Sequence, residues 1–265
     1  MFIIIVDTHI HLDNKQYYED IDDVILRAIE NGVKGFLIPG ADFNDLPQAI
    51  KLAEKYNEVF FAVGIHPYDI DQYDEKIMQE YINHPKCIAV GECGLDYYRL
   101  PEEDEEKKQN IAKQKEVFIA QIEFAKKVKK PLIVHIREAS NDSKQILLDY
   151  NAKEVGGVLH CYNASEHLLP LAEHNFYFGI GGVLTFKNAK KLVDVLPKIP
   201  KEKLLIETDG PYLTPHPFRG KRNEPLYTTY VAKKISELLE IPKEDVEKIT
   251  TTNTVTLFKE FSTII

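Results

Sequence analysis

Eight short apolar runs alternate with longer amphipathic segments along the 265 residues of this chain. The apolar runs are mostly continuous stretches of Ile, Val, Leu and Phe, which is typical of parallel strands covered on both faces. They span residues 2–8, 35–39, 59–65, 87–92, 131–136, 157–161, 176–181 and 204–208. Strands that alternate with helices predict a parallel sheet with right-handed crossovers, and eight of them predict closure into a TIM-barrel-like (β/α)8 fold.

The intervening segments show helical periodicity. Phe118, Ile122, Ala125 and Val128 recur at the spacing of one buried helix face. The preceding stretch "PEEDEEKK" has the acid-then-base order of a helix start, but we expect a solvated charged turn there. The tail from Pro225 predicts two more helices on the outside. Because neither a Pro/Ser-rich linker nor an internal repeat divides the chain, we expect a single domain over residues 1–265.

The net charge and the cysteine content of the chain limit the binding partners and the cellular compartment that we expect. The formal net charge of −9 argues against a broad basic face that clamps duplex nucleic acid, although a small, locally positive pocket is compatible with it. The apolar run at residues 2–8 is too short for a membrane span and has no basic flank, so we expect no membrane association. Three cysteines suit a reducing compartment, and we expect a cytoplasmic protein. We expect the cysteines to be small buried hydrophobic residues, with Cys93 and Cys161 pointing outward from the strands.

Metal-binding side chains cluster where the predicted strands end. The carboxyl ends of barrel strands converge on one mouth, so residues that follow different strands are expected to meet there. Six of the eight strands end in such residues, which are His9, His11, His66, Glu92, His135, His160 and Asp209. Because His9 and His11 are two positions apart, both side chains can face the barrel axis.

This donor set indicates two cations. Four histidines and two carboxylates, with His66 set aside, exceed what a single structural zinc requires, and they fit a pair of divalent ions that share a bridging carboxylate. Nitrogen and oxygen donors without thiolate suit Zn²⁺, Mg²⁺, Mn²⁺ or Co²⁺. A water molecule activated by such ions is a nucleophile for hydrolysis, and no Ser–His–Asp or Cys–His arrangement accompanies these blocks to indicate a covalent intermediate.

Ordered sequence blocks along nearly the whole chain resemble the TatD family of metal-dependent hydrolases, in the amidohydrolase superfamily. They are "DTHIHL", "VGIHP", "VGECGLDYYR", "PLIVHIREASND", "GGVLHCY", "GIGGVLTFKNA", "IETDGPYLTP" and "RGKRNEP". The resemblance implies a TIM-barrel-like fold, a two-metal site and hydrolase activity, most often described as deoxyribonuclease. It implies that His9 and His11 bind the first metal, that Glu92 bridges, and that His135 and His160 bind the second. The resemblance also implies that Asp209 binds the first metal and serves as the catalytic base. Glu92 is the second catalytic residue that it implies.

Some positions depart from the family pattern. Gly210 stands where Ala or Ser is usual, Cys93 replaces an aliphatic residue, and "HCYNAS" replaces the common "HCFSG". None of these changes removes an expected ligand. The altered residues after His160 can change the adjoining loop and, with it, the preference for substrate.

Phosphodiester hydrolysis also requires positive groups near the metals. Arg137 lies two residues after His135 and is expected to face the pocket, where its planar guanidinium suits two phosphate oxygens. Arg219, Lys221 and Arg222 form a cationic cluster after the eighth strand. We expect at least one of these to contact phosphate, the alternative being a solvated loop or ion pairs with Glu224.

Other residues near the mouth are expected to have supporting roles. We expect His66 to contact substrate rather than metal, because six other donors already suffice for two ions. Asp7 is expected to support His9 or His11 from behind, and Asp142 to lie at a helix N-terminus. Tyr97 and Tyr98 are expected to pack, with stacking on a nucleobase as the alternative. The role of His216 stays open.

The leading hypothesis is a metal-dependent nuclease that cleaves phosphodiester bonds of DNA, with RNA as an open alternative, in single strands or frayed ends. The same site could hydrolyse an amide, a lactone or a phosphotriester. A non-catalytic metal-binding scaffold is the alternative of another class, and no obligate protein partner is evident. The charge of the Arg137, Arg219, Lys221 and Arg222 group distinguishes diester cleavage from the hydrolysis of a neutral substrate.

Overall fold

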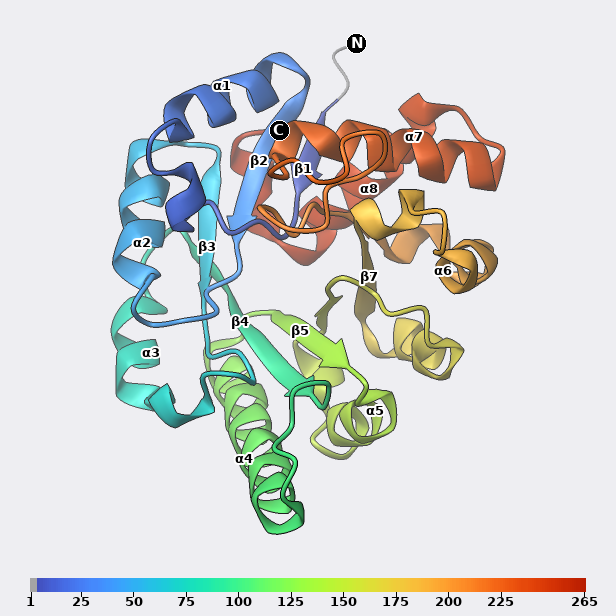
Figure 1. Ribbon diagram of the computed structural model, residues 1–265. Helices are drawn as coiled ribbons and strands as arrows, with labels where there is room; N and C mark the ends of the chain where they lie inside the picture. The colour runs from blue at the N-terminus through green and yellow to red at the C-terminus, as the bar shows by residue number, and fades with distance from the viewer. Residues whose placement is uncertain (1–3) are drawn as a thin grey trace.

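The eight predicted strands are present in a computed structural model that describes residues 4–265 (Figure 1). They are β1 (Ile5–Asp7), β2 (Val33–Ile38), β3 (Val59–Val63), β4 (Cys87–Asp96), β5 (Leu132–Arg137), β6 (Gly157–Leu159), β7 (Phe176–Ile180) and β8 (Leu204–Ile206). Each strand pairs in parallel with the next, in the order β1 to β8. The (β/α)8 prediction is therefore confirmed, while residues 2 and 3 of the first predicted strand lie outside the described residues.

The first and last strands meet at a seam that completes the barrel. The Thr8 backbone N–H donates to the carbonyl of Ile206 (3.1 Å), and the Asp209 N–H donates to that of His9 (2.9 Å). Just beyond the strands, Ile10 and Gly210 form an isolated parallel bridge. This seam brings the ends of the sequence blocks "DTHIHL" and "IETDG" side by side.

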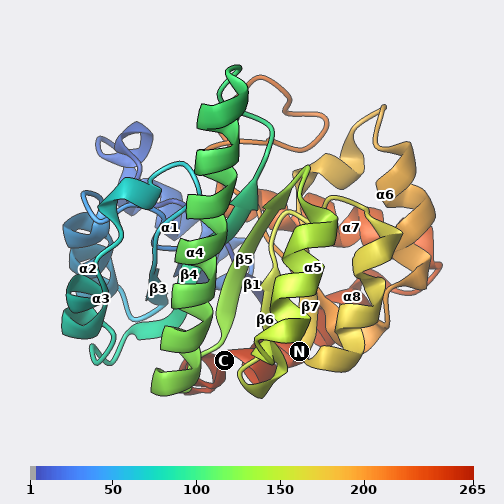
Figure 2. The same ribbon diagram turned by 90° about the horizontal axis from the view of Figure 1, so that it is seen from below.

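Helices surround the barrel on all sides (Figures 1 and 2). The α-helices are α1 (Ile21–Glu30), α2 (Leu46–Lys55), α3 (Glu75–Tyr81), α4 (Asp104–Val128), α5 (Ser140–Asp149), α6 (Lys190–Val195), α7 (Thr228–Leu239) and α8 (Lys243–Leu257). Short 3₁₀ segments are η1 (Lys15–Tyr17), η2 (Ile70–Gln72), η3 (Ala152–Glu154), η4 (Glu166–His174), η5 (Gly182–Thr185), η6 (Leu196–Lys198), η7 (Lys201–Lys203), η8 (Pro225–Tyr227) and η9 (Lys259–Thr263). The crossover between β6 and β7 is the 3₁₀ segment η4, which contains Pro170. Within residues 4–265, the structure has no helix that combines the length and the apolar character needed to cross a membrane.

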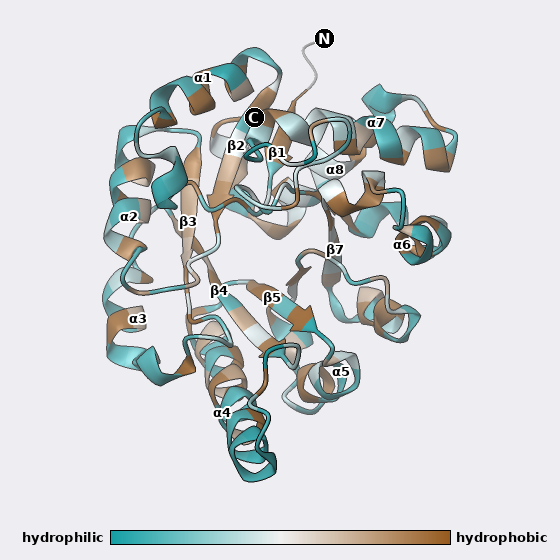
Figure 3. Ribbon diagram, viewed as in Figure 1, coloured by the Kyte–Doolittle hydropathy of each residue, from teal (hydrophilic) through white to brown (hydrophobic). Residues whose placement is uncertain are grey.

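The strands separate two hydrophobic cores, because alternate side chains point to opposite faces. The outer core lies between strands and helices, and Figure 3 shows hydrophobic residues on the strands with hydrophilic ones over much of the outer helices. The inner core fills the barrel with side chains from every strand, which are Val6, Leu37, Phe60, Ala62, Ile88, Ala89, Ile133, Val158, Tyr177 and Leu205. Phe258 and Phe261, which follow α8, pack into the same inner core. Cys87 and Cys93 are buried in the outer core, as expected.

The charged segment before the long central helix differs from our expectation. The turn predicted at "PEEDEEKK" is wrong from Asp104 onward, because α4 begins there. The Glu103 side chain caps the helix by accepting hydrogen bonds from the N–H groups of Glu105 (2.9 Å) and Glu106 (3.0 Å). Acidic residues in the first turn also complement the positive end of the helix dipole, which favours helix over turn. The two helices predicted after Pro225 are α7 and α8.

Candidate metal centre

The six predicted ligands meet at the carboxyl end of the barrel. They come from five strands or the residues directly after them, namely His9 and His11 (β1), Glu92 (β4), His135 (β5), His160 (β6) and Asp209 (β8). Residues that are up to 200 positions apart in sequence therefore share one pocket. The geometric condition for a shared metal centre, that these donors converge, is met.

Glu92 lies at the centre of the cluster. Its Oε1 atom is 2.8 Å from His160 Nε2 and 2.9 Å from His135 Nδ1. Its Oε2 atom is 3.3 Å from His9 Nε2 and 3.9 Å from His11 Nε2. Burial by itself raises the pKa of Glu92, but the nearby His160 and His9 rings hold that pKa well below its usual range. The two oxygens of one ionised carboxylate thus face two different sets of imidazoles.

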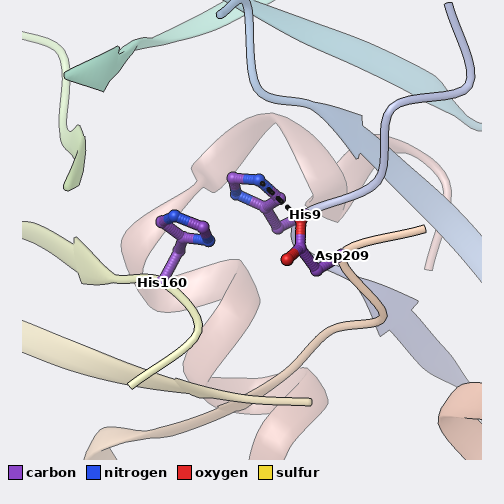
Figure 4. A group of neighbouring side chains, drawn as sticks. All are labelled: His9, His160 and Asp209. Carbon is purple, nitrogen blue, oxygen red and sulfur yellow. Dashed lines mark ion pairs between the residues drawn. The ribbon is translucent and has the colours of Figure 1, made fainter. Parts of the chain in front are cut away.

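Asp209 closes the cluster on the side of the seam (Figure 4). Its Oδ1 atom is 3.7 Å from Nε2 of both His9 and His11. The imidazoles of His9 and His160 lie in parallel planes with centroids 3.9 Å apart. The Asp209 side chain remains 17% exposed, unlike the fully buried His9, so it also reaches the open mouth.

His66 lies closer to the centre than the sequence indicated. Its Nε2 atom is 3.5 Å from Glu92 Oε1, and His66, Glu92 and His135 together offer ligand atoms spaced for one ion. Its Nδ1 accepts a hydrogen bond from the Tyr68 N–H (3.1 Å), which turns Nε2 toward the cluster. Burial lowers the pKa of His66 to about 3, so the ring is neutral, which is the form that binds metal. His66 is therefore a candidate ligand in addition to a candidate substrate contact.

The hydrogen bonding of the predicted ligands also indicates a site for cations. Among the described residues, the His9 Nε2 atom, which faces Glu92 and Asp209, is buried without a hydrogen-bond partner. A buried polar atom left unpaired costs about 1–3 kcal/mol, and ligation is the chemistry that removes this cost for an imidazole. Two further groups with ligand spacing, His9/His11/Glu92 and His9/His160/Asp209, occur in the same pocket.

Asp96 is a functional candidate that our sequence analysis missed. It ends β4, and its Oδ2 is 2.9 Å from His135 Nε2, while its Oδ1 accepts the Tyr98 N–H (2.9 Å). A carboxylate behind a histidine fixes the ring orientation and the tautomer. Here it directs His135 Nδ1 to Glu92. The signal was available, because Asp96 is four positions after Glu92 on the same strand.

Glu207 was missed as well, although it is two positions before Asp209. It is fully buried, and its Oε1 accepts the Cys161 N–H and lies 3.9 Å from His160 Nδ1. Burial raises its pKa to about 8.

Cys161 does not follow the predicted strand alternation, because β6 ends at Leu159 and Cys161 has a φ of 42°. Burial and the nearby carboxylates Asp209 and Glu207 raise the pKa of this thiol well above 9, so it stays protonated.

Asp7 supports the site from behind, as expected. Its Oδ1 accepts the N–H groups of Thr208 (2.9 Å) and His9 (3.3 Å), and its Oδ2 accepts the Thr208 hydroxyl (2.6 Å). Burial raises the pKa of Asp7 to about 8. One carboxylate therefore holds the backbone of both segments that carry metal-binding candidates at the seam.

The predicted cationic residues differ in availability. Arg137 is exposed, and its guanidinium lies 3.7 Å from the centre of the Tyr98 ring. Arg222 is instead engaged in ion pairs with Asp20 (2.6 Å) and Glu224 (2.9 Å). Arg222 therefore forms the ion pairs that we considered as the alternative to phosphate contact. These pairs anchor the long loop after β8 to the region of α1.

The rest of that loop is more open. Arg219 and Lys221 are exposed, although Arg219 donates to the Thr214 carbonyl (3.0 Å) and covers the Phe186 ring. His216 is also exposed, and its backbone N–H donates to Thr185 Oγ1 (2.8 Å). These side chains stay candidates for phosphate contact.

Tyr97 and Asp142 have the structural roles that we expected. Asp142 lies in the first turn of α5, where its Oδ2 accepts the hydroxyl of Tyr97 (2.7 Å) and pairs with Lys115 (2.7 Å). Tyr98, in contrast, points to solvent.

Comparison with known proteins agrees with this geometry. A family model described as "TatD related DNase" matches residues 6–259. An "Uncharacterized metal-dependent hydrolase YabD" of Bacillus subtilis is 43% identical, over 96% of this chain and 98% of that protein. A "3'-5' ssDNA/RNA exonuclease TatD" of Escherichia coli is 35% identical, over 87% of this chain and 89% of that protein.

A solved structure is similar along almost the whole chain. The crystal structure of YJJV, a TatD homolog from Escherichia coli K12, matches with a TM-score of 0.87 and 27% identity. The match covers 98% of this chain and 99% of that one. The barrel and its order of strands are thus shared with an experimentally determined relative.

Proposed function

The chain belongs to the TatD related DNase family of metal-dependent hydrolases, and from this premise we propose that it is a two-cation nuclease acting on single-stranded or frayed DNA. One observation carries the proposal: the buried Glu92 carboxylate has one oxygen toward His135 and His160 and the other toward His9 and His11. A carboxylate in that position can bridge two ions. The printed name of the E. coli relative, an exonuclease for ssDNA and RNA, supports nucleic acid as substrate, with RNA as a second candidate.

The ligands divide into two groups around Glu92. We assign His9, His11 and Asp209 to one cation, and His135 and His160, with His66 within reach, to the other. Zn²⁺, Mg²⁺, Mn²⁺ and Co²⁺ all accept such donors. When bound, two divalent cations supply an activated water and stabilise the charge that develops on phosphate oxygens.

The residues of the chain position the reactants. Asp209 Oδ1 faces His9 and His11, and the partly exposed carboxylate can orient the attacking water and accept its proton. Asp96 keeps His135 directed at Glu92. Arg137, Arg219 and Lys221 are the exposed cations that bind the phosphates of the strand, while Arg222 is excluded from this role by its ion pairs.

The test is cleavage of a 3′- or 5′-labelled single-stranded oligonucleotide across a panel of the four metals, with metal content measured in parallel. Glu92→Gln and Asp209→Asn should each lower the rate at least about 100-fold, whereas Asp149→Asn at the exposed end of α5 should not. A metal-loaded wild-type protein that cleaves no oligonucleotide overturns the proposal. Turnover of a neutral amide, lactone or phosphotriester by that protein would then support the alternative hydrolase, and metal binding without any turnover would support the scaffold.

A further inference from the structure

Three tyrosines at the mouth of the barrel expose large parts of their rings. The exposed fractions are 41% for Tyr68, 55% for Tyr98 and 52% for Tyr212, although most aromatic side chains of the chain are buried or partly buried. They come from three separate loops, which follow β3, β4 and β8. Exposed aromatic rings around a candidate nuclease site indicate a binding surface for bases.

Each of the three rings lies beside a candidate metal ligand or a cation of the mouth. The Tyr68 ring is 4.7 Å from that of His66, and the Tyr212 ring is 6.4 Å from that of His11. The Tyr98 backbone N–H donates a hydrogen bond to Asp96, the residue that contacts His135. The rings therefore flank the centre on both the His66 side and the His11 side.

Guanidinium groups accompany two of these rings. Arg137 covers Tyr98 with 3.7 Å between the guanidinium carbon and the ring centre, and Arg99 covers Tyr68 at 5.2 Å. Both arginines are exposed. Alternating aromatic rings and cations match the alternating bases and phosphates of an unpaired strand.

We propose that Tyr68, Tyr98 and Tyr212 are stacking platforms that hold unpaired nucleobases beside the scissile phosphate. This inference rests on the proposed nuclease function and adds the basis of strand selection. Bases inside a duplex already stack on their neighbours, so only a single strand or a frayed end can place bases on these rings. Stacking uses the flat face that every base has, so the platforms select for unpaired nucleotides with little regard to sequence.

The cleanest test uses Tyr98 and Tyr212, because the Tyr68 ring packs against that of His66, a candidate ligand (4.7 Å), and its loss would disturb the centre. The probe is a phosphorothioate single strand that carries 2-aminopurine near its 3′ end, whose fluorescence falls when the base stacks. A second strand has the same backbone but abasic residues at the terminal positions. Tyr150→Ala is the matched control, because Tyr150 is 37% exposed at the opposite end of α5.

We expect Tyr98→Ala and Tyr212→Ala to weaken binding of the base-containing strand about tenfold each and to reduce quenching. Tyr98→Phe and Tyr212→Phe should keep both properties, and all variants should bind the abasic strand as the wild type does. Equal losses on both strands, or no loss on either, would overturn the inference. If the wild type binds neither strand, the nuclease proposal itself fails, and that outcome is distinct because it does not depend on the tyrosines.

Discussion

The Asp7 carboxylate accepts hydrogen bonds from both the backbone N–H (2.9 Å) and the hydroxyl (2.6 Å) of Thr208, and so joins the first strand of the barrel to the segment after the last. Backbone hydrogen bonds of Thr8 to Ile206, of Asp209 to His9 and of His11 to Gly210 cross the same seam. His9 and Asp209, which are proposed to share a cation, lie directly on either side of it. The pair therefore links barrel closure to the geometry of the candidate metal centre.

Replacing Asp7 with alanine should lower the free energy of unfolding by about 1–3 kcal/mol, because it leaves the buried Thr208 N–H without an acceptor. Metal affinity should fall roughly 10- to 100-fold, as is typical when a group behind a ligand is lost. Urea denaturation and metal titration measure the two effects. Thr208→Val is the comparison variant, since it keeps the Thr208 N–H bond to Asp7 and removes the hydroxyl, together with its bonds to Asp7 and to the Gly210 N–H (3.2 Å). An Asp7→Ala variant as stable as the wild type would contradict the role of this bond.

Divalent cations should raise the thermal midpoint of unfolding. At a free concentration one hundred times Kd, binding to the folded state alone adds about 2.7 kcal/mol. For a chain of this size that corresponds to roughly 5–10 °C, read by calorimetry with and without chelator. Glu92→Gln should remove most of the shift because Glu92 faces both ligand groups. Equal shifts in the two proteins would show that the ions bind elsewhere.

Arg137 and Arg222 should respond differently to alanine substitution. Loss of Arg137 should weaken oligonucleotide binding and reduce the slope of log K against log salt by about 0.7, the value for one phosphate contact on a single strand. Loss of Arg222 should leave that slope unchanged and lower stability by about 1–2 kcal/mol, because its ion pairs are only partly buried. Binding isotherms at several salt concentrations decide the matter, and a changed slope in Arg222→Ala would show that Arg222 binds phosphate.

The Asp20–Arg222 pair also predicts a dependence of stability on pH. The Arg222 guanidinium holds the pKa of Asp20 below its usual value of 3.8. A depressed pKa means that the stabilisation is present above pH 3.8 and is lost as the pH falls through the folded-state pKa. The difference in unfolding free energy between wild type and Asp20→Asn should be constant from pH 7 to about pH 5 and shrink below about pH 4. A difference that grows on acidification would contradict this assignment.

The sequence alone determined the barrel and the convergence of six predicted ligands at one rim. Continuous apolar runs mark buried parallel strands locally, and a closed parallel barrel places all their carboxyl ends at one rim, so residues such as Glu92 and His160 had to converge. Periodicity also placed Cys93 outward correctly. Periodicity was misleading at Cys161, where the strand had already ended. At "PEEDEEKK" we expected a turn, because we underestimated the helix-capping carboxylate of Glu103.

Only the tertiary structure decided how the side chains share their partners. The approach of His66 to Glu92, the support of His135 by Asp96 and the engagement of Arg222 by Asp20 depend on rotamers and on contacts between distant segments. Arg222 and Asp20 are 202 positions apart, so no local pattern relates them. Strand and helix positions follow from short-range periodicity, whereas the pairing of charges and hydrogen bonds follows from which loops the closed barrel brings within a few ångströms.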